Sequence, residues 1–169
     1  MTSLTLTRRG SPLADPARQR AVLDGGGLLP FESALATGGL WPLEATGVEV
    51  LQVNLGKLCN QTCRHCHVDA GPDRREVMSR ETMELCLDAV SRARISCVDI
   101  TGGAPELNPD FRYLVAEARR RGAHVIDRCN LTILMAPGYR DLPEFLAEQG
   151  VDGRVAALLH GGQHRCPEG

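Results

Sequence analysis

A strand-then-helix pattern that occurs three times in succession is the feature that most constrains the fold of this chain. Each candidate strand is short and apolar, and a segment with apolar residues at helical spacing follows it. The expected strands are residues 48–55, 97–100 and 123–127, and the expected helices are residues 79–93, 110–121 and 141–149. Strands that alternate with helices in this way pair in parallel through right-handed crossovers. The sequence therefore predicts an α/β fold with three βα units of an open or barrel-like sheet.

Two loops that directly follow strands carry the residues of chemical interest. The first holds Cys59, Cys63 and Cys66 in the spacing C-x3-C-x2-C, and the second is a short turn at Gly102–Gly103. Loops at the carboxyl ends of parallel strands meet at one edge of the sheet, where α/β proteins place their functional sites. We therefore expect the cysteine loop and the glycine turn to share one site.

The three cysteines favour an iron–sulfur cluster. Cysteine thiolates are the usual protein ligands of such clusters, and three of them in one short loop suit three corners of a cubane. The loop has no fourth cysteine, so one iron is left open for a substrate or cofactor. The alternative is a zinc site completed by His65 or His67, but zinc favours paired C-x2-C knuckles and a second knuckle is missing.

This arrangement resembles the radical S-adenosylmethionine (SAM) enzymes, in which C-x3-C-x2-C follows the first strand of a partial (β/α) barrel. The resemblance implies that Cys59, Cys63 and Cys66 hold a 4Fe-4S cluster whose open iron binds SAM. It also implies that an electron from the cluster cleaves SAM to methionine and a 5′-deoxyadenosyl radical. An electron donor such as flavodoxin or ferredoxin is then an expected partner. Only about the first three βα units of such a barrel are present.

The same resemblance implies further cofactor contacts. A Gly-Gly-Glu-Pro turn in the family meets the SAM amine, so Gly102 and Gly103 are expected to contact SAM through their backbone. Ala104 stands where the acidic residue is expected, and Glu106 is the candidate replacement. His65 occupies the position before the last cysteine, which is usually aromatic, and is expected to pack over the cluster and the adenine.

The segments around these motifs resemble, more narrowly, the arsenosugar-biosynthesis radical SAM family, also called the radical SAM/Cys-rich proteins. They are residues 51–55, 65–72, 75–78, 101–107 and 127–132. This resemblance implies that the small-molecule substrate is a methylated trivalent arsenical, to which a 5′-deoxyadenosyl group is attached. Two alternatives stay open. One is a radical SAM enzyme that acts on a peptide or another small molecule, and the other is a non-catalytic zinc- or iron–sulfur-binding module.

Three residues at the end of the third strand, Arg128, Cys129 and Asn130, are expected to face the same site. Asn130 is expected to bind the cofactor, and a thiolate such as Cys129 suits a soft arsenic centre. The structural alternative is that Cys129 is a small buried residue and that Arg128 pairs with Asp127. The sequence does not choose between these interpretations.

Composition argues against a nucleic-acid or membrane partner. The net charge is −2, and no apolar run is long enough to cross a bilayer. Arg8 and Arg9 mimic the start of a twin-arginine export signal, but no apolar segment follows them. The seven cysteines are an odd number, so a disulfide framework is disfavoured. We therefore expect a cytoplasmic protein.

The two ends differ from the radical SAM core expected at residues 47–150. Residues 1–46 are expected to form an irregular leader with one short helix from Asp15 to Leu23. Residues 151–169 lose strand character, and plausible codons for them, read one base later, restore a strand like that of the family. We therefore expect a truncated core with an unpaired third-strand edge and an out-of-frame tail. The alternative for the tail is a metal site built from His160, His164 and Cys166.

Overall fold

The structure is a computed structural model that describes residues 4–63 and 66–153. The chain divides into two compact units, Leu6–Val48 and a larger unit in which Thr5 joins Glu49 and the residues after it. The elements of the larger unit are β1 (Val50–Asn54), α3 (Arg80–Ala93), β2 (Cys97–Thr101), η2 (Pro105–Leu107), α4 (Phe111–Arg120), β3 (His124–Asp127), η3 (Thr132–Met135), α5 (Leu142–Glu148) and β4 (Asp152–Gly153).

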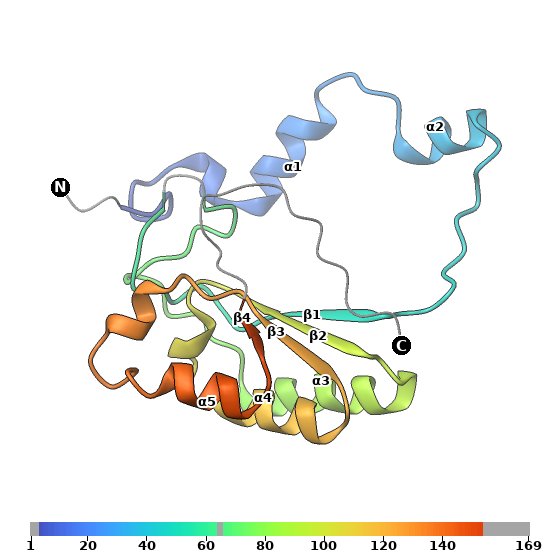
Figure 1. Cartoon of the computed structure of the whole chain (residues 1–169). Helices are drawn as coiled ribbons and strands as arrows, with labels where there is room; N and C mark the ends of the chain where they lie inside the picture. Colours follow the sequence, from blue (N-terminus) through green and yellow to red (C-terminus); the bar gives the residue numbers. More distant parts are fainter. Residues whose placement is uncertain (1–3, 64–65, 154–169) are drawn as a thin grey trace. The chain divides into compact units, whose positions relative to one another are not determined.

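The larger unit is built on one parallel sheet with the strand order β1-β2-β3-β4 (Figure 1). The register pairs Val53 with Ile100 and Ile100 with Asp127, so the carboxyl ends of the first three strands lie level. The expected α/β fold with parallel strands is confirmed. The loops after β1, β2 and β3 consequently leave the sheet at the same edge.

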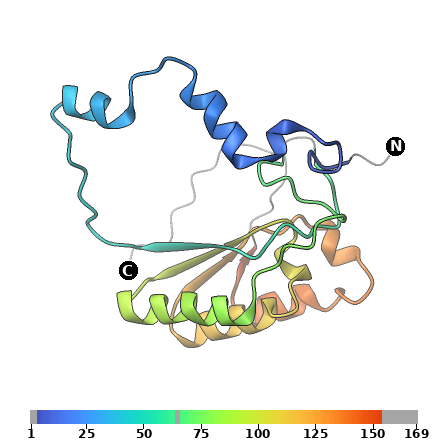
Figure 2. The same ribbon diagram turned by 180° about the vertical axis from the view of Figure 1, so that it is seen from behind.

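Helices α3, α4 and α5 cover one face of this sheet, as both views show (Figure 1, Figure 2). Their buried residues recur at spacings of three and four, and they pack on the strands in one apolar core. The main contributors are Met83, Leu87 and Val90 of α3, Phe111, Leu114, Val115 and Ala118 of α4, and Val53, Val98, Ile100 and Val125 of the strands. The sheet is therefore anchored from one side by the residues that the periodicity predicts.

The helix boundaries follow local signals in the sequence. The Ser79 side chain accepts a hydrogen bond from the backbone N–H of Thr82 and caps α3. Gly122 and Gly150 take positive φ angles just after α4 and α5, where an L-residue with a side chain is disfavoured. The expected start of α3 and the expected stops of α4 and α5 are confirmed.

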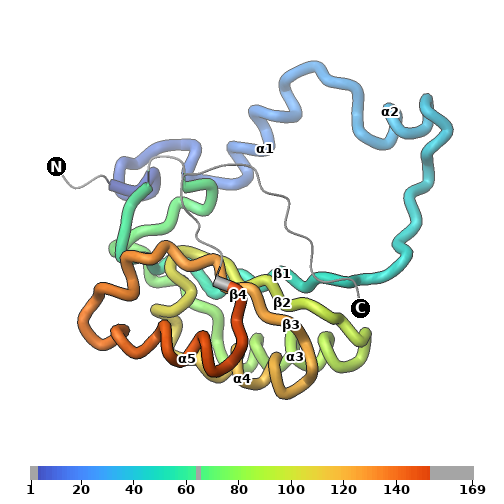
Figure 3. Tube along the Cα trace, in the orientation of Figure 1, coloured from blue at the N-terminus to red at the C-terminus, as the bar shows by residue number. Residues whose placement is uncertain are grey.

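The smaller unit contains η1 (Pro12–Ala14), α1 (Pro16–Asp24) and α2 (Phe31–Thr37), which the tube in Figure 3 traces in sequence order. Asp15 caps α1 by accepting a hydrogen bond of 2.9 Å from the N–H of Ala17, as expected for that short helix. Helix α2 was not expected. Neither helix contains a buried residue.

Strand β4 corrects the expectation for the third strand. Asp152 pairs with Ile126 and Gly153 pairs with Asp127, and Nε2 of His124 lies 3.1 Å from Oδ2 of Asp152. The prediction that the edge of β3 is unpaired is therefore wrong at these two positions. Residues 154–169, including His160, His164 and Cys166, lie outside the described residues. No helix in the described ranges has the length and apolar character needed to cross a membrane.

Candidate metal centre

The loop between β1 and α3 is held to the sheet by main-chain hydrogen bonds. The N–H of Leu55 donates to Thr101 O over 2.8 Å, and the N–H of Met78 donates to Leu55 O over 3.0 Å, so both ends of the loop are fixed. Within the loop, Cys59 N–H donates to Gly71 O and Gly71 N–H donates to Lys57 O. The segment was expected only as a long polar loop, but its main chain folds back so that Gly71 hydrogen-bonds with Lys57 and Cys59.

The three cysteines of this loop line one cavity of about 250 Å³. Gly102 and Gly103 after β2 and Asn130 after β3 line the same cavity. The structure therefore brings together the cysteine loop, the glycine turn and Asn130, as expected from their places at the ends of parallel strands. His67 also lines the cavity, whereas His65 lies outside the described residues.

Hydrogen-bond donors surround two of the three sulfurs. The N–H of Gln61 donates to Cys59 Sγ over 3.4 Å, Nδ2 of Asn130 donates to the same sulfur over 3.6 Å, and the N–H of Ala70 donates to Cys66 Sγ over 3.3 Å. Burial raises the pKa of the Cys59 thiol, and the first two donors oppose that rise. Such donors favour the negatively charged sulfur that a metal ligand requires.

The donor set of this cavity suits a cluster better than a single zinc ion. Ligands around one tetrahedral zinc lie roughly 4 Å apart, given zinc–sulfur bonds of about 2.3 Å. Within the described ranges, the one set of three candidate ligand residues whose atoms lie within 4.8 Å of one another excludes these cysteines. Three thiolates that line one cavity suit a cubane, which carries its ligands on separate corners. The residues present therefore fit a 4Fe-4S cluster.

The Gly102–Gly103 turn lies directly against the cysteine loop. Gly103 N–H donates to Gly56 O and Ala104 N–H donates to Leu58 O, both over 2.9 Å. A Cβ atom on Gly103 would clash with Leu58 O and would lie 2.9 Å from Cys59 Cβ. The glycine is required here for close backbone approach, and the turn consequently fixes the position of a candidate ligand.

Asn130 connects the loop after β3 to the cysteine loop. Besides the contact with Cys59, its Nδ2 donates to Asn60 Oδ1 over 2.8 Å, and its Oδ1 accepts hydrogen bonds from Thr132 Oγ1 and Ile133 N–H. Asn60 in turn donates to Thr132 over 2.9 Å. This network holds Asn130 at the edge of the cavity, where it was expected.

Two structural supports of the loop were missed by sequence reasoning. Arg74 donates to the side chain and backbone oxygen of Asp69 and pairs with Glu76, and this pairing lowers the pKa of Glu76 to about 2. Asn108, which is buried, donates to Met78 O over 2.9 Å and to Leu55 O over 3.3 Å. An Asn-Pro-Asp turn in the sequence was the one available signal for Asn108.

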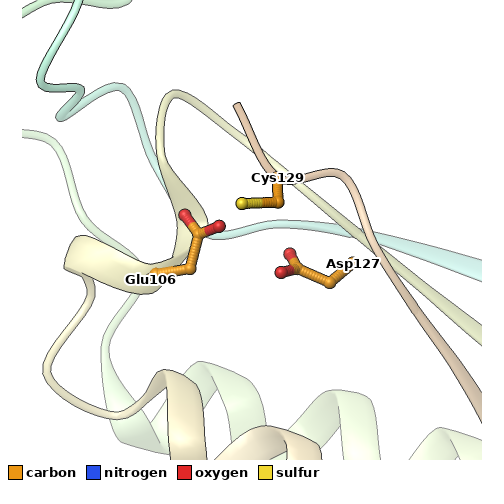
Figure 4. Close-up of side chains that lie close together, drawn as sticks. All are labelled: Glu106, Asp127 and Cys129. Carbon is orange, nitrogen blue, oxygen red and sulfur yellow. The ribbon is translucent and has the colours of Figure 1, made fainter. Parts of the chain in front are cut away.

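Glu106 does not reach the cavity, contrary to its expected role as a SAM contact. It lies with Asp127 and Cys129 in a buried cluster (Figure 4), and the ligand atoms of the three residues are within 4.8 Å of one another. Burial raises the pKa of Glu106, and burial together with Glu106 raises the pKa of Asp127 to about 8. Burial disfavours the charged form of both carboxyl groups, and no hydrogen bond to their oxygens is found among the described residues.

Cys129 also departs from expectation. It belongs to the apolar core and is only 2% exposed, and burial beside Glu106 raises the pKa of its thiol. Because side chains alternate along a strand, Arg128 and Asn130 line the cavity while Cys129 does not. Cys129 is therefore a small buried residue, as the structural alternative expected. The expected pairing of Arg128 with Asp127 is wrong, because Arg128 pairs with Asp99.

Comparison with known proteins agrees with this geometry. A family model described as the radical SAM superfamily matches residues 53–165. A probable GTP 3′,8-cyclase from Pyrococcus horikoshii is 33% identical over 102 residues, which are 60% of this chain and 31% of that protein. A protein of the same name from Sulfurisphaera tokodaii is 28% identical over 113 residues, which are 67% of this chain and 34% of that protein.

The chain thus spans about a third of the length of the curated relatives it matches. Their names do not support the narrower resemblance to arsenosugar biosynthesis, which stays a proposal. The family match itself covers well over half of the residues. The chain therefore belongs to the radical SAM superfamily.

Proposed function

We propose that this chain provides the cluster-binding and SAM-cleaving part of a radical SAM enzyme. The observation that carries the proposal is the convergence of Cys59, Cys63 and Cys66 with the Gly102–Gly103 turn on one cavity. The superfamily uses a 4Fe-4S cluster and SAM, and the three-cysteine set leaves one iron for SAM. When bound, the cluster supplies the electron that cleaves the C–S bond of SAM.

The described residues have distinct roles in this proposal. Cys59, Cys63 and Cys66 hold three irons. The hydrogen bonds from Asn130 and from the N–H groups of Gln61 and Ala70 stabilise the sulfur charge and so tune the reduction potential. Gly102 and Gly103 offer backbone groups to the methionyl end of SAM. The SAM amine is not assigned to Glu106, because its carboxyl lies in the buried cluster.

For the substrate, we propose a methylated trivalent arsenical that receives a 5′-deoxyadenosyl group. The support for this is the resemblance of segments such as residues 65–72 and 127–132 to the arsenosugar family. GTP is the second candidate, because the relatives from Pyrococcus horikoshii and Sulfurisphaera tokodaii carry the name probable GTP 3′,8-cyclase. Either reaction needs a reductant, for which flavodoxin or ferredoxin is the proposed donor.

Anaerobic reconstitution tests the cofactor assignment. The purified chain is treated with ferrous iron and sulfide, and the iron content, the visible absorption and the electron paramagnetic resonance spectrum of the dithionite-reduced protein are recorded with and without SAM. We expect about four irons per chain and a spectrum that changes with SAM. Replacement of Cys59, Cys63 and Cys66 together by Ser should abolish both. A chain that binds zinc tightly and no iron would instead support the non-catalytic module.

Product analysis separates the substrates. The reduced, reconstituted protein is incubated with SAM and either dimethylarsinous acid or GTP, and the products are identified by mass spectrometry. An adduct of 5′-deoxyadenosine with arsenic supports the first candidate, whereas a cyclised GTP with free 5′-deoxyadenosine supports the second. Formation of 5′-deoxyadenosine without either product would reject both substrates and leave SAM cleavage in place.

A further inference from the structure

A row of polar side chains crosses the sheet face opposite the helices. Gln52 on β1 and Asp99 on β2 are partners in the strand register, and Arg128 follows β3 on the same side. Gln52 and Arg128 line the cavity that holds the three cysteines. This row is not used by the proposed cluster site.

The guanidinium of Arg128 is held in one orientation. Its Nε donates to Asp99 Oδ1 over 2.8 Å and its Nη2 donates to Oδ2 over 2.7 Å, while Gln52 Nε2 donates to the same carboxylate over 3.4 Å. The Asp99 side chain is 8% exposed and that of Arg128 is 41% exposed. Because a guanidinium has five N–H donors, this pairing leaves others free on the exposed part of the group.

The chemistry of the cavity singles out this group. Among the described lining residues, Arg128 is the one with a permanent positive charge, and none of them is an aspartate or a glutamate. Its partner Asp99 is not a lining residue and balances its charge, so long-range attraction of an anion is weak. What the pair offers instead is a set of N–H donors on a guanidinium that lines the cavity and is held in one orientation.

We propose that Arg128, oriented by Asp99, is an oxyanion-binding residue of this cavity, taking a carboxylate or phosphate group of the molecule bound there. Two sources supply that chemistry, namely the methionyl carboxylate of SAM and an acidic group of the substrate. The first source rests on the proposed function, whereas the second requires only the cavity. Asp99 acts as a positioning residue, since it reaches the ligand only through Arg128.

Binding measurements on the full chain test this inference. The variants are R128Q, R128K and the double variant D99N/R128Q, which removes the pair without leaving a buried carboxylate unpaired. The control is R92Q, which removes the same charge from a side chain that is 83% exposed on α3. Thermal unfolding of each variant verifies that it is folded.

The probes distinguish the two sources. Isothermal titration under anaerobic conditions compares SAM with decarboxylated SAM on the reconstituted protein, and inorganic triphosphate is titrated into the protein without iron. If the ligand is the SAM carboxylate, R128Q and D99N/R128Q weaken SAM binding by about tenfold or more and leave decarboxylated SAM unchanged. If it is a substrate group, the same variants lose triphosphate binding instead. R128K should fall between R128Q and the wild-type chain, because it keeps the charge and loses the planar fork.

The inference is overturned if no probe depends on Arg128, or if R92Q has the same effect as R128Q. Failure of the proposed function has a different signature, since the wild-type chain would then take up no iron or show no change with SAM. The triphosphate titration remains decisive in that case. If the wild-type chain and R128Q then bind triphosphate equally, that result alone rejects the oxyanion site.

Discussion

At the scale of single residues, the most unusual feature is the pair of carboxyl groups in the core. Glu106 is 4% exposed and Asp127 is fully buried, and their oxygens have no hydrogen-bond partner in the part of the chain that the structure describes. A buried, unpaired carboxylate is costly, and two of them side by side are more so. This desolvation cost is avoided when a carboxyl group keeps its proton. The pKa of both groups is raised, which favours the protonated form.

The pH dependence of stability follows from this pair. The pKa of Asp127 rises from its usual 3.8 to about 8 in the folded chain, so the folded state binds more protons than the unfolded state between these values. The contribution of Asp127 to the free energy of unfolding is fully present below about pH 4 and is lost as the pH rises through 8. We expect D127N to reduce the loss of unfolding free energy between pH 5 and 8 by about 1–3 kcal/mol.

Urea titrations at several pH values measure this effect. The control is D88N, which changes an exposed carboxyl group paired with Arg92 on α3. D127N should flatten the profile while D88N leaves it unchanged. If D127N and wild type lose stability in parallel between pH 5 and 8, the carboxyl pair is not the source.

At the scale of elements, the cysteine loop owes its shape to contacts with neighbours rather than to its own sequence. The Gly102–Gly103 turn supports the loop from β2, Asn108 ties both of its ends, and Arg74 braces its interior. Each of these supports includes a hydrogen bond to a main-chain oxygen of the loop. The position of the ligands therefore depends on residues that never touch a metal.

The glycine turn should be intolerant of any side chain. In G103A the new Cβ meets Leu58 O and Cys59 Cβ, so the loop must shift. We expect iron incorporation after reconstitution to fall at least severalfold, measured as iron and sulfide per chain. The control G38A adds the same methyl group where its nearest neighbour would be 3.6 Å away. Full incorporation by G103A would show that the turn does not position Cys59.

Asn108 should matter for stability more than its exposed counterpart at the start of the loop. N108A leaves Met78 O and the N–H of Asp110 without their side-chain partner in a buried position, at a cost of about 1–3 kcal/mol of unfolding free energy. N54A removes one exposed hydrogen bond, to Gly56 N–H, and should cost less. Denaturant titration of both variants compares them, and an equal cost would contradict the assigned role of Asn108.

At the scale of the whole molecule, the larger unit combines one well-covered sheet face with one polar face. The apolar core lies between the strands and helices α3, α4 and α5, whereas Gln52, Asp99 and Arg128 occupy the other side. The cavity joins three loops that come from three different strands. A group bound there cross-links them, so binding and folding are coupled.

Cluster loss should therefore destabilise the chain. We expect the reconstituted protein to melt several degrees above the iron-free protein, because a ligand at a hundred times its Kd stabilises by about 2.7 kcal/mol. Differential scanning calorimetry under anaerobic conditions, before and after iron chelation, measures the shift. The triple Cys-to-Ser variant should show no shift with iron and sulfide. An equal shift in that variant would place the iron elsewhere.

Local patterns in the sequence determined the elements of this protein. Periodicity predicted α3, α4 and the first three strands, and caps such as Ser79 and Gly122 marked helix ends, because these signals act between residues close in the chain. The C-x3-C-x2-C spacing likewise indicated a cluster site, since its chemistry depends on residue type and proximity. Parallel pairing then placed the cysteine loop and the glycine turn at one edge.

Tertiary structure alone decided which side chains meet at that edge. Arg128 and Cys129 are neighbours in the chain, yet one faces the cavity and the other joins Glu106 in the core. Asn108 and Arg74 support a loop whose folded path no local pattern specifies. The physical reason is that such contacts arise from the packing of segments distant in the sequence. They form, and stabilise the fold, only after the sheet has assembled.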